Sequence, residues 1–184
     1  VFRQAMESAI VMNAHRINRG LFPVLNEKGK DFFFVKRGGH EEAVHTIVDL
    51  IVRRIPGFFP CNAITDIQVL TPMRKSPVGM HHLNAVLQKA LNPPHPGKPE
   101  KEFRDVVIRI GDKMMQIKNN YTMAWKLFDR RGMLTEEGTG IYNGDEGIVS
   151  AIDRDREVVR LLFNDGKTVD YEYSQLDELE HSYA

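Results

Sequence analysis

The chain has 184 residues, 42% of them hydrophobic and 27% charged, which suits one medium-sized domain or a domain joined to a small module. The only cysteine, Cys61, excludes an internal disulfide and fits a reducing compartment, and no stretch approaches the roughly 20 apolar residues of a membrane helix. The zero net charge divides into a basic stretch, residues 1–131 with 21 Lys and Arg against 12 Asp and Glu, and an acidic one, residues 132–184 with 4 against 13.

The first half of the sequence predicts helices alternating with strands. Residues 4–19 predict a helix whose apolar face is made of Met6, Ile10, Ala14 and Ile17. Residues 41–55 predict a second helix that ends at Pro56-Gly57, and a third follows Ser76-Pro77, with the serine as its cap. Residues 31–35 and 67–71 predict two short buried strands.

The second half changes in character. Residues 92–99 contain four prolines and a glycine, which predicts an irregular connector. After it come predicted strands at residues 106–110, 113–117, 147–152, 158–163 and 168–173. Helix–strand alternation followed by short strands predicts an α/β layer domain joined to a small β-barrel.

Motifs of nucleotide or metal binding are missing from this sequence. The triplet Gly166-Lys167-Thr168 is no P-loop, because Leu161 stands where the motif requires glycine, and a hairpin turn explains it better. The adjacent His81 and His82 do not share a helix face, so a metal site is not expected. We expect Cys61 to be structural.

Three groups of residues could contact phosphates. Arg3 stands before a helix and could reach a phosphate of a neighbouring lobe, or could be a surface arginine. Thr71, Arg74 and Lys75 follow a predicted strand, where open α/β sheets bind ligands, although a solvated loop has the same composition. The third group could hold phosphates and stack on a base, or form a polar hairpin tip; it consists of Lys118, Asn119, Asn120 and Tyr121.

With these residues in place, the chain resembles the C-terminal part of a RecD-like, superfamily 1B DNA helicase of the RecD/TraA type. The resemblance runs over nearly the whole chain, with residues 23–65 and 123–140 uninformative. Its main stretches are Phe2-Arg3-Gln4-Ala5, Gln68-Val69-Leu70-Thr71-Pro72-Met73-Arg74-Lys75, Gly111-Asp112-Lys113-Met114-Met115-Gln116, Asn119-Asn120-Tyr121 and Tyr142-Asn143-Gly144-Asp145-Glu146-Gly147. Ser76 departs from the glycine expected in the loop.

The resemblance implies a RecA-like (P-loop NTPase-type) parallel-sheet lobe, incomplete, with an inserted SH3-like β-barrel. We expect residues 1–110 to belong to the second RecA-like lobe and residues 111–184 to the barrel with its connecting strands. Since the chain opens at Val1 in a helical pattern, we interpret it as a fragment of a longer cytoplasmic protein. The missing N-terminal RecA-like lobe would carry the P-loop and the Mg²⁺-binding acid.

The resemblance also implies residue roles. Arg3 would contact the γ-phosphate of ATP across the cleft between the lobes, supported by Gln4. Thr71, Arg74 and Lys75 would lie near a track of single-stranded DNA, and Asn119 and Asn120 near the barrel junction. In the longer protein, ATP and Mg²⁺ would drive 5′ to 3′ movement on single-stranded DNA in repair or recombination. The fragment alone is expected to bind neither cofactor and to be inactive.

Two other functions stay open. The barrel could be a non-catalytic module that binds protein or nucleic acid, and its acidity favours protein. The chain could instead serve partners within a nuclease complex of the exodeoxyribonuclease V alpha type. Salt-dependent binding of single-stranded DNA to residues 1–131 favours the helicase lobe, whereas binding confined to residues 144–180 favours the module.

Overall fold

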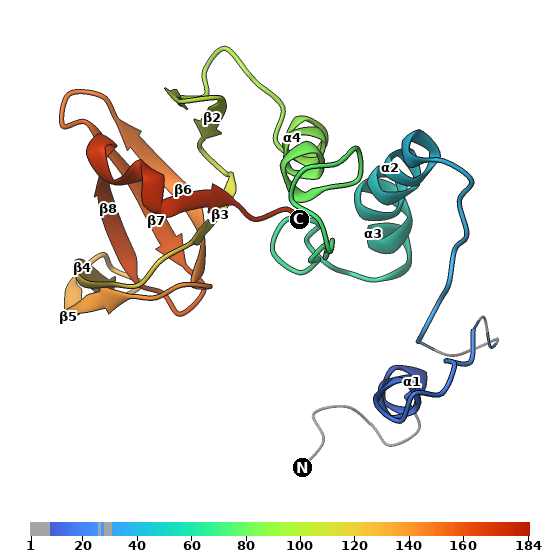
Figure 1. The fold of residues 1–184 in the computed structure, drawn as a ribbon. Coiled ribbons are helices and arrows are strands. Elements are labelled where there is room, and N and C mark those ends of the chain that lie inside the picture. The colour runs from blue at the N-terminus through green and yellow to red at the C-terminus, as the bar shows by residue number, and fades with distance from the viewer. Residues whose placement is uncertain (1–7, 26, 28–30) are drawn as a thin grey trace. The chain divides into compact units, whose positions relative to one another are not determined.

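The computed structural model describes residues 8–25, 27 and 31–184, and the chain divides into two compact units, Val1–Gly39 and His40–Ala184. In the first unit, α1 spans Ala9–Asn18 (Figure 1). Ser8 caps it by accepting a hydrogen bond from the Val11 N–H, and the Asp31 carboxylate accepts another from the Ala9 N–H. Free amides at a helix start require such acceptors.

The predicted apolar face of α1 is wrong. Ile10, Ala14 and Ile17 are exposed, whereas Ala9 and Asn13 are buried; Met6 lies outside the described residues. The reason is polar, because the Asn13 amide donates to the carbonyl of Val24 and accepts from its N–H. A satisfied side-chain amide, rather than the apolar stripe, sets the covered side.

In the second unit, one helical stretch runs through Pro56, where the sequence predicts an end. It consists of α2 (His40–Asp49), the π-helical η1 (Leu50–Arg54) and α3 (Ile55–Phe58). A proline ring clashes with the carbonyl four residues earlier in an α-helix. The wider π turn before Pro56 is the kind of irregularity that relieves this clash.

The helix α4 spans Met80–Leu91 and begins later than the sequence predicts. Its cap is Gly79 instead of Ser76, which lies in the preceding turn. A β-carbon at Gly79 would lie 2.7 Å from the Ser76 nitrogen and 2.8 Å from the Arg74 carbonyl oxygen, so the turn requires glycine. Leu83 and Leu87 of α4 pack with Ile51 and Tyr183 in a helical core.

The predicted segments 31–35 and 67–71 do not form strands in this structure, and the described residues do not confirm the predicted parallel sheet. Both segments are irregular, and the residue pairs between strands in the described residues are all antiparallel. A strand exists only where a neighbour accepts and donates its backbone hydrogen bonds. Among the described residues, no neighbour pairs with either segment in a sheet.

The rest of the second unit is β-structure (Figure 1). A two-stranded sheet joins β1 (Glu100–Phe103) to β2 (Val106–Arg109). The larger sheet has the order β5-β4-β8-β7-β6-β3-β9. Its strands are β3 (Lys113–Gln116), β4 (Asn120–Phe128), β5 (Leu134–Ile141), β6 (Glu146–Asp153), β7 (Val158–Phe163), β8 (Thr168–Glu172) and β9 (Leu179–His181), with a 3₁₀ helix η2 (Tyr173–Glu178) before the last.

This sheet encloses a second core, separate from the helical one. Apolar side chains alternate along β7, with Val159, Leu161 and Phe163 buried on one side. The predicted hairpin turn after β7 is confirmed, since Gly166 has a φ of +90°, which side chains rarely adopt. The domain division after residue 110 stays a prediction. In the described part of the chain, no helix is long and apolar enough to span a membrane.

Gly147 gives a test of the close packing between β6 and β7. A β-carbon there would lie 2.8 Å from the backbone oxygen of Leu162, which a flexible side chain cannot relieve. We expect Gly147→Ala to lower the free energy of unfolding by about 1–3 kcal/mol. Gly57→Ala in α3 is the control, because nothing lies within 4 Å of its β-carbon and helical alanine gains about 0.5–1 kcal/mol. Chemical denaturation measures both, and equal effects would contradict this packing.

Candidate nucleic-acid interface

The structure places the predicted site residues at two positions of the second unit. Thr71, Arg74 and Lys75 lie in the loop before α4, and residues 118–121 lie at the β3–β4 connection and the start of β4. Arg3 and Gln4 lie outside the described residues. The candidate site therefore consists of the loop before α4 and the β3–β4 connection of the seven-stranded sheet, which we call the curled sheet.

The loop before α4 is folded back on the helix start. The Met80 N–H donates to the Met73 carbonyl at 2.9 Å, and the His81 N–H donates to the Arg74 carbonyl at 3.3 Å. The Thr71 hydroxyl donates to the Val78 carbonyl at 2.8 Å, so its hydrogen is already used within the loop. Arg74 and Lys75 are the exposed cations of this loop.

Arg74 already has an acidic neighbour. Its guanidinium donates to Oε1 of Glu180 in β9 at 2.5 Å. The arginine side chain is mostly exposed, and this contact uses one of its five N–H donors. An exposed pair of this kind is worth about 0.2–1 kcal/mol, so a phosphate could compete for the guanidinium.

The second group is also tied to acids. Lys118 Nζ lies 3.2 Å from the Asp177 carboxylate and 3.6 Å from that of Glu178. The hydrogen bond to Asp177 is the main cause that raises the pKa of Lys118, so the lysine stays charged. The Asn120 amide donates to both oxygens of Glu178, at 3.2 and 2.9 Å.

Residues 177–180, which we name the acidic segment, thus contact both predicted groups. Glu180 holds Arg74, and Asp177 and Glu178 hold Lys118 and Asn120. The sequence shows the acidic run Asp177-Glu178-Leu179-Glu180 plainly, but nothing in it says which cations lie opposite. The two predicted groups, the loop before α4 and residues 118–121, therefore both contact the acidic segment, and no contact between the two groups themselves is seen among these bonds.

An exposed aromatic pair lies beside the second group. The rings of Tyr121 and Tyr142 meet edge to face, with centroids 5.8 Å apart and planes at 72°. Asn119 links the two sides, because its amide donates to the Tyr121 hydroxyl at 3.3 Å and its oxygen accepts from the Asn143 N–H at 2.9 Å. Tyr142 was not among the predicted site residues, although an aromatic directly before an Asn-Gly turn is the available signal.

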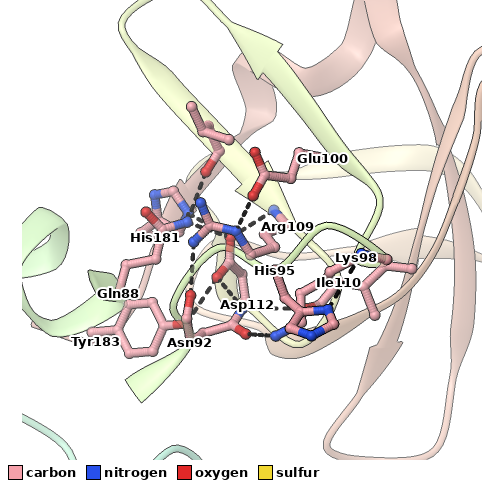
Figure 2. Close-up of polar contacts among 12 residues, drawn as sticks. Gln88, Asn92, His95, Lys98, Glu100, Arg109, Ile110, Asp112, His181 and Tyr183 are labelled. Atoms are coloured by element: carbon pink, nitrogen blue, oxygen red, sulfur yellow. Dashed lines mark hydrogen bonds and ion pairs between the residues drawn. The ribbon is translucent and has the colours of Figure 1, made fainter. Parts of the chain in front are cut away.

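A buried carboxylate lies at the centre of the unit (Figure 2). Asp112, in the turn before β3, is fully buried and hydrogen-bonded on both oxygens. Its neighbours come from α4, β2 and the C-terminal strand: Gln88 Nε2 at 2.7 Å, Asn92 Nδ2 at 2.6 Å, the Arg109 N–H at 2.7 Å, His181 Nε2 at 3.0 Å and the Tyr183 hydroxyl at 2.9 Å. We call this group the Asp112 network.

A second layer fixes the amides that reach Asp112. The buried Arg109 guanidinium donates to Glu100 at 2.5 Å and to the Asn92 carbonyl at 2.7 Å. Lys98 Nζ donates to the Asn92 side-chain oxygen at 2.5 Å, as Figure 2 shows. Because the buried polar groups of this network have partners on both the helical and the sheet side, the helical core and the sheet are joined by directional bonds.

The ionisation of Asp112 follows from these contacts. Burial acts to raise its pKa, but the hydrogen bonds from His181, Asn92 and the Arg109 N–H, with the charge of His181, hold that pKa below the ordinary value. Burial and the nearby Asp112 charge also raise the pKa of the Tyr183 hydroxyl, which therefore stays a hydrogen-bond donor. The network thus needs Asp112 as a carboxylate.

Gly166-Lys167-Thr168, the triplet that resembles part of a P-loop, lies in the turn between β7 and β8. No group of three His, Cys, Asp or Glu side chains that could hold a metal ion occurs in the part of the chain that the structure describes.

Comparison with known proteins finds similarity to one helicase family. Residues 83–163, from α4 through β7, match the family described as the ATP-dependent RecD-like DNA helicase SH3 domain. These similarities support a RecD-like helicase fragment, and the segment that matches the SH3 domain includes α4, β1 and β2 as well as strands β3–β7 of the larger sheet.

One relative is the ATP-dependent RecD2 DNA helicase of Deinococcus radiodurans, which is 30% identical over 184 residues. The match covers 100% of this chain and 21% of the relative, so the chain spans about a fifth of that protein. A solved structure on DNA unwinding at forked double-stranded DNA by two coordinating Pif1 helicases covers 83% of this chain and 38% of its own. Its TM-score of 0.27 and identity of 12% do not establish a common fold.

Asp112→Asn tests the network. Loss of the charge leaves strong donors around a weaker acceptor, and we expect the free energy of unfolding at neutral pH to fall by about 2–4 kcal/mol. Because the folded pKa of Asp112 is lowered, its contribution is fully present above about pH 3.9 and is lost as the pH falls through the folded value. The difference between wild type and variant should therefore shrink below about pH 4.

Denaturant unfolding at a series of pH values measures this difference. Asp105→Asn is the matched control, since Asp105 is exposed in the β1–β2 turn and should change stability by less than about 0.5 kcal/mol. A difference between wild type and Asp112→Asn that stays constant down to acidic pH would show that the charge of Asp112 is unimportant.

Proposed function

We propose that this chain is part of an ATP-dependent DNA helicase and that its second unit contacts single-stranded DNA while the longer protein moves 5′ to 3′ in repair or recombination. The similarity to RecD2 over the whole chain supports the activity. The observation that carries the DNA contact is the pair of exposed cations, Arg74 and Lys75, on the loop held against the start of α4.

The proposed contact is with the DNA backbone. Arg74 and Lys75 would bind phosphates, which provides grip on any sequence. Tyr121 offers an exposed ring on which a base can stack, with Asn119 and Asn120 beside it. Thr71 would act mainly by shaping the loop, because its hydroxyl hydrogen is engaged with Val78.

The acidic segment would compete with DNA for these cations. Glu180 neutralises Arg74, and Asp177 and Glu178 neutralise Lys118, so a phosphate must displace a carboxylate from each. Exposed ion pairs are weak enough to exchange partners. The segment would thereby reduce tight static binding, which suits a protein that must release each nucleotide as it moves.

A RecA-like lobe around the helical core is part of this proposal. Burial alternates along residues 67–71, since Ile67, Val69 and Thr71 are half-buried whereas Gln68 and Leu70 are exposed. This period of two is typical of a strand. Ile67 and Val69 pack against the helical core, as an inner strand of a layered lobe would.

Removal of the two loop cations tests the DNA contact. We expect Arg74→Ala combined with Lys75→Ala to weaken binding of a labelled single-stranded oligonucleotide about tenfold at low salt, because two phosphate contacts are lost. The slope of log affinity against log salt should fall by about 1.4. Fluorescence anisotropy across a salt series measures both. An unchanged slope would reject the role of this loop and favour a protein-binding module.

The opposite change provides the matched control. Glu180→Gln keeps a hydrogen-bond acceptor beside Arg74 but removes its charge, so affinity should rise about two- to fivefold. Glu136→Gln, an exposed glutamate on β5, should have no effect. The gain from Glu180→Gln should disappear in the Arg74→Ala background; a gain that persists there would mean that Glu180 does not act through Arg74.

The role of Arg3 follows from the resemblance, with Gln4 as its support. In the longer protein, we expect Arg3→Ala to abolish ATP hydrolysis, because a γ-phosphate would lose a cationic partner during transfer. DNA binding should stay unchanged. A steady-state assay with single-stranded DNA measures turnover, and wild-type turnover in the variant would remove Arg3 from the proposed site.

A further inference from the structure

The hairpin of β4 and β5 continues beyond the rest of the sheet. The pairing of β4 with its inner neighbour β8 is between Lys126 and Thr168. Past Lys126, β5 alone accompanies β4, with Phe128 opposite Leu134. Residues 128–134, which we name the hairpin tip, therefore form the end of a two-stranded arm.

The hairpin tip has a defined turn. The Asp129 N–H donates to the Met133 carbonyl at 2.9 Å, and the Gly132 N–H donates to the Asp129 carbonyl at 3.0 Å. The Asp129 carboxylate accepts from the N–H groups of Arg131 and Met133, at 2.8 and 2.9 Å. Gly132 has a φ of +76°, which suits glycine. These bonds fix the tip before any partner arrives, which lowers the entropy cost of binding.

The side chains of this ordered tip are unusually apolar for their exposure. Phe128 is 46% exposed, Met133 65% and Leu134 50%. Isolated apolar side chains on a surface are ordinary, but Phe128 and Leu134 are cross-strand partners that share one face of the hairpin, and Met133 precedes Leu134, so apolar side chains are concentrated at the tip. None of the three belongs to the apolar core of the curled sheet.

The tip also carries unpaired cations. Arg130 and Arg131 are exposed, and neither has a carboxylate within ion-pair distance among the described residues. Several other cations of the sheet do have one, although Lys126 has none within that distance in the described part of the chain: Lys113 pairs with Glu146, Lys118 with Asp177, Arg160 with Asp170 and Lys167 with Asp165. The charge of Asp129 is engaged with backbone amides, and Glu136 and Glu137 lie further along β5, opposite Leu127 and Lys126.

Resting on the proposed function, we propose that the hairpin tip binds the end of a nucleic-acid duplex where it meets the single strand. Arginines without carboxylate partners suit phosphates. Apolar and aromatic side chains suit the exposed face of a terminal base pair, because apolar wedges bind between or against bases in other nucleic-acid complexes. The tip combines both on a rigid turn. It extends the site from a single-strand grip to recognition of a junction.

Two probes test this inference on the purified chain: a labelled oligonucleotide alone, and the same strand with half of its length annealed to a complement. Wild type should bind the junction more tightly. Phe128→Ser with Met133→Ser should weaken junction binding about fivefold or more, with single-strand binding within about twofold. Arg130→Gln with Arg131→Gln should lower the salt slope for the junction by about 2. Because Phe128 and Met133 are 46% and 65% exposed, the thermal unfolding midpoint should fall by no more than about a few degrees, and the arginine variant should not change it.

Lys89→Gln with Arg104→Gln is the matched control, because both cations are exposed and lie away from the tip. It should leave the ratio of the two affinities unchanged. The inference fails if wild type does not prefer the junction, or if the tip variants keep the wild-type ratio. It also fails if a tip variant changes the oligomeric state while junction preference is retained, since the tip would then be a protein contact.

The two failures can be told apart. If Arg74→Ala with Lys75→Ala leaves both probes bound as in wild type, the proposed function fails. If that variant weakens binding but the tip variants leave the affinity ratio unchanged, the single-strand contact stands and only the tip assignment is wrong.

Discussion

The structure of the second unit depends on one buried carboxylate. Asp112 is charged and lies out of water, so the unit is stable only if donors surround it on both oxygens. Those donors come from α4, from β2 and from the segment after β9. Hydrophobic packing alone would let the helical core and the sheet slide past each other, because it has little directional preference. The Asp112 network supplies the direction.

The C-terminal residues 180–183 contribute both to the buried Asp112 network and to the ion pairs at the surface. His181 and Tyr183 reach inward to Asp112, while Glu180, on the same strand, reaches Arg74. A change in how Arg74 is paired therefore occurs one residue from the network that joins the two cores. The ion pair of the loop before α4 and the hydrogen bonds of the Asp112 network are thus made by adjacent residues of the chain.

Net charge is a poor guide to this surface. The basic excess of residues 1–131 and the acidic excess of residues 132–184 cancel locally, as at Lys118 with Asp177. What distinguishes one cation from another is its neighbour in space. Arg74 and Lys118 face carboxylates, whereas Arg130 and Arg131 do not. The regional charges are visible in the sequence, but the local pairing is a property of the fold.

Periodicity by itself determined most of the regular elements. The helix that begins with α2 and the strand β7 were predicted correctly, because their apolar side chains recur with the period of the element. Predictions failed where a partner decides. Residues 67–71 have a strand pattern but pair with no strand among the described residues. The segments β4 and β5 have a weak strand pattern, yet they are strands because they pair with each other in the sheet.

The sequence by itself determined the family resemblance, the connector after α4, and which residues could bind phosphate, since these depend on residue type and spacing. The tertiary structure alone decided that Asp112 is surrounded by donors, that Glu180 faces Arg74, and that the hairpin tip extends past the pairing of β4 with β8. The first two are contacts between residues far apart in the chain, and the third depends on where the pairing of β4 with β8 ends. Hydrogen bonds and ion pairs act over a few ångströms in space, and that distance cannot be read along a sequence.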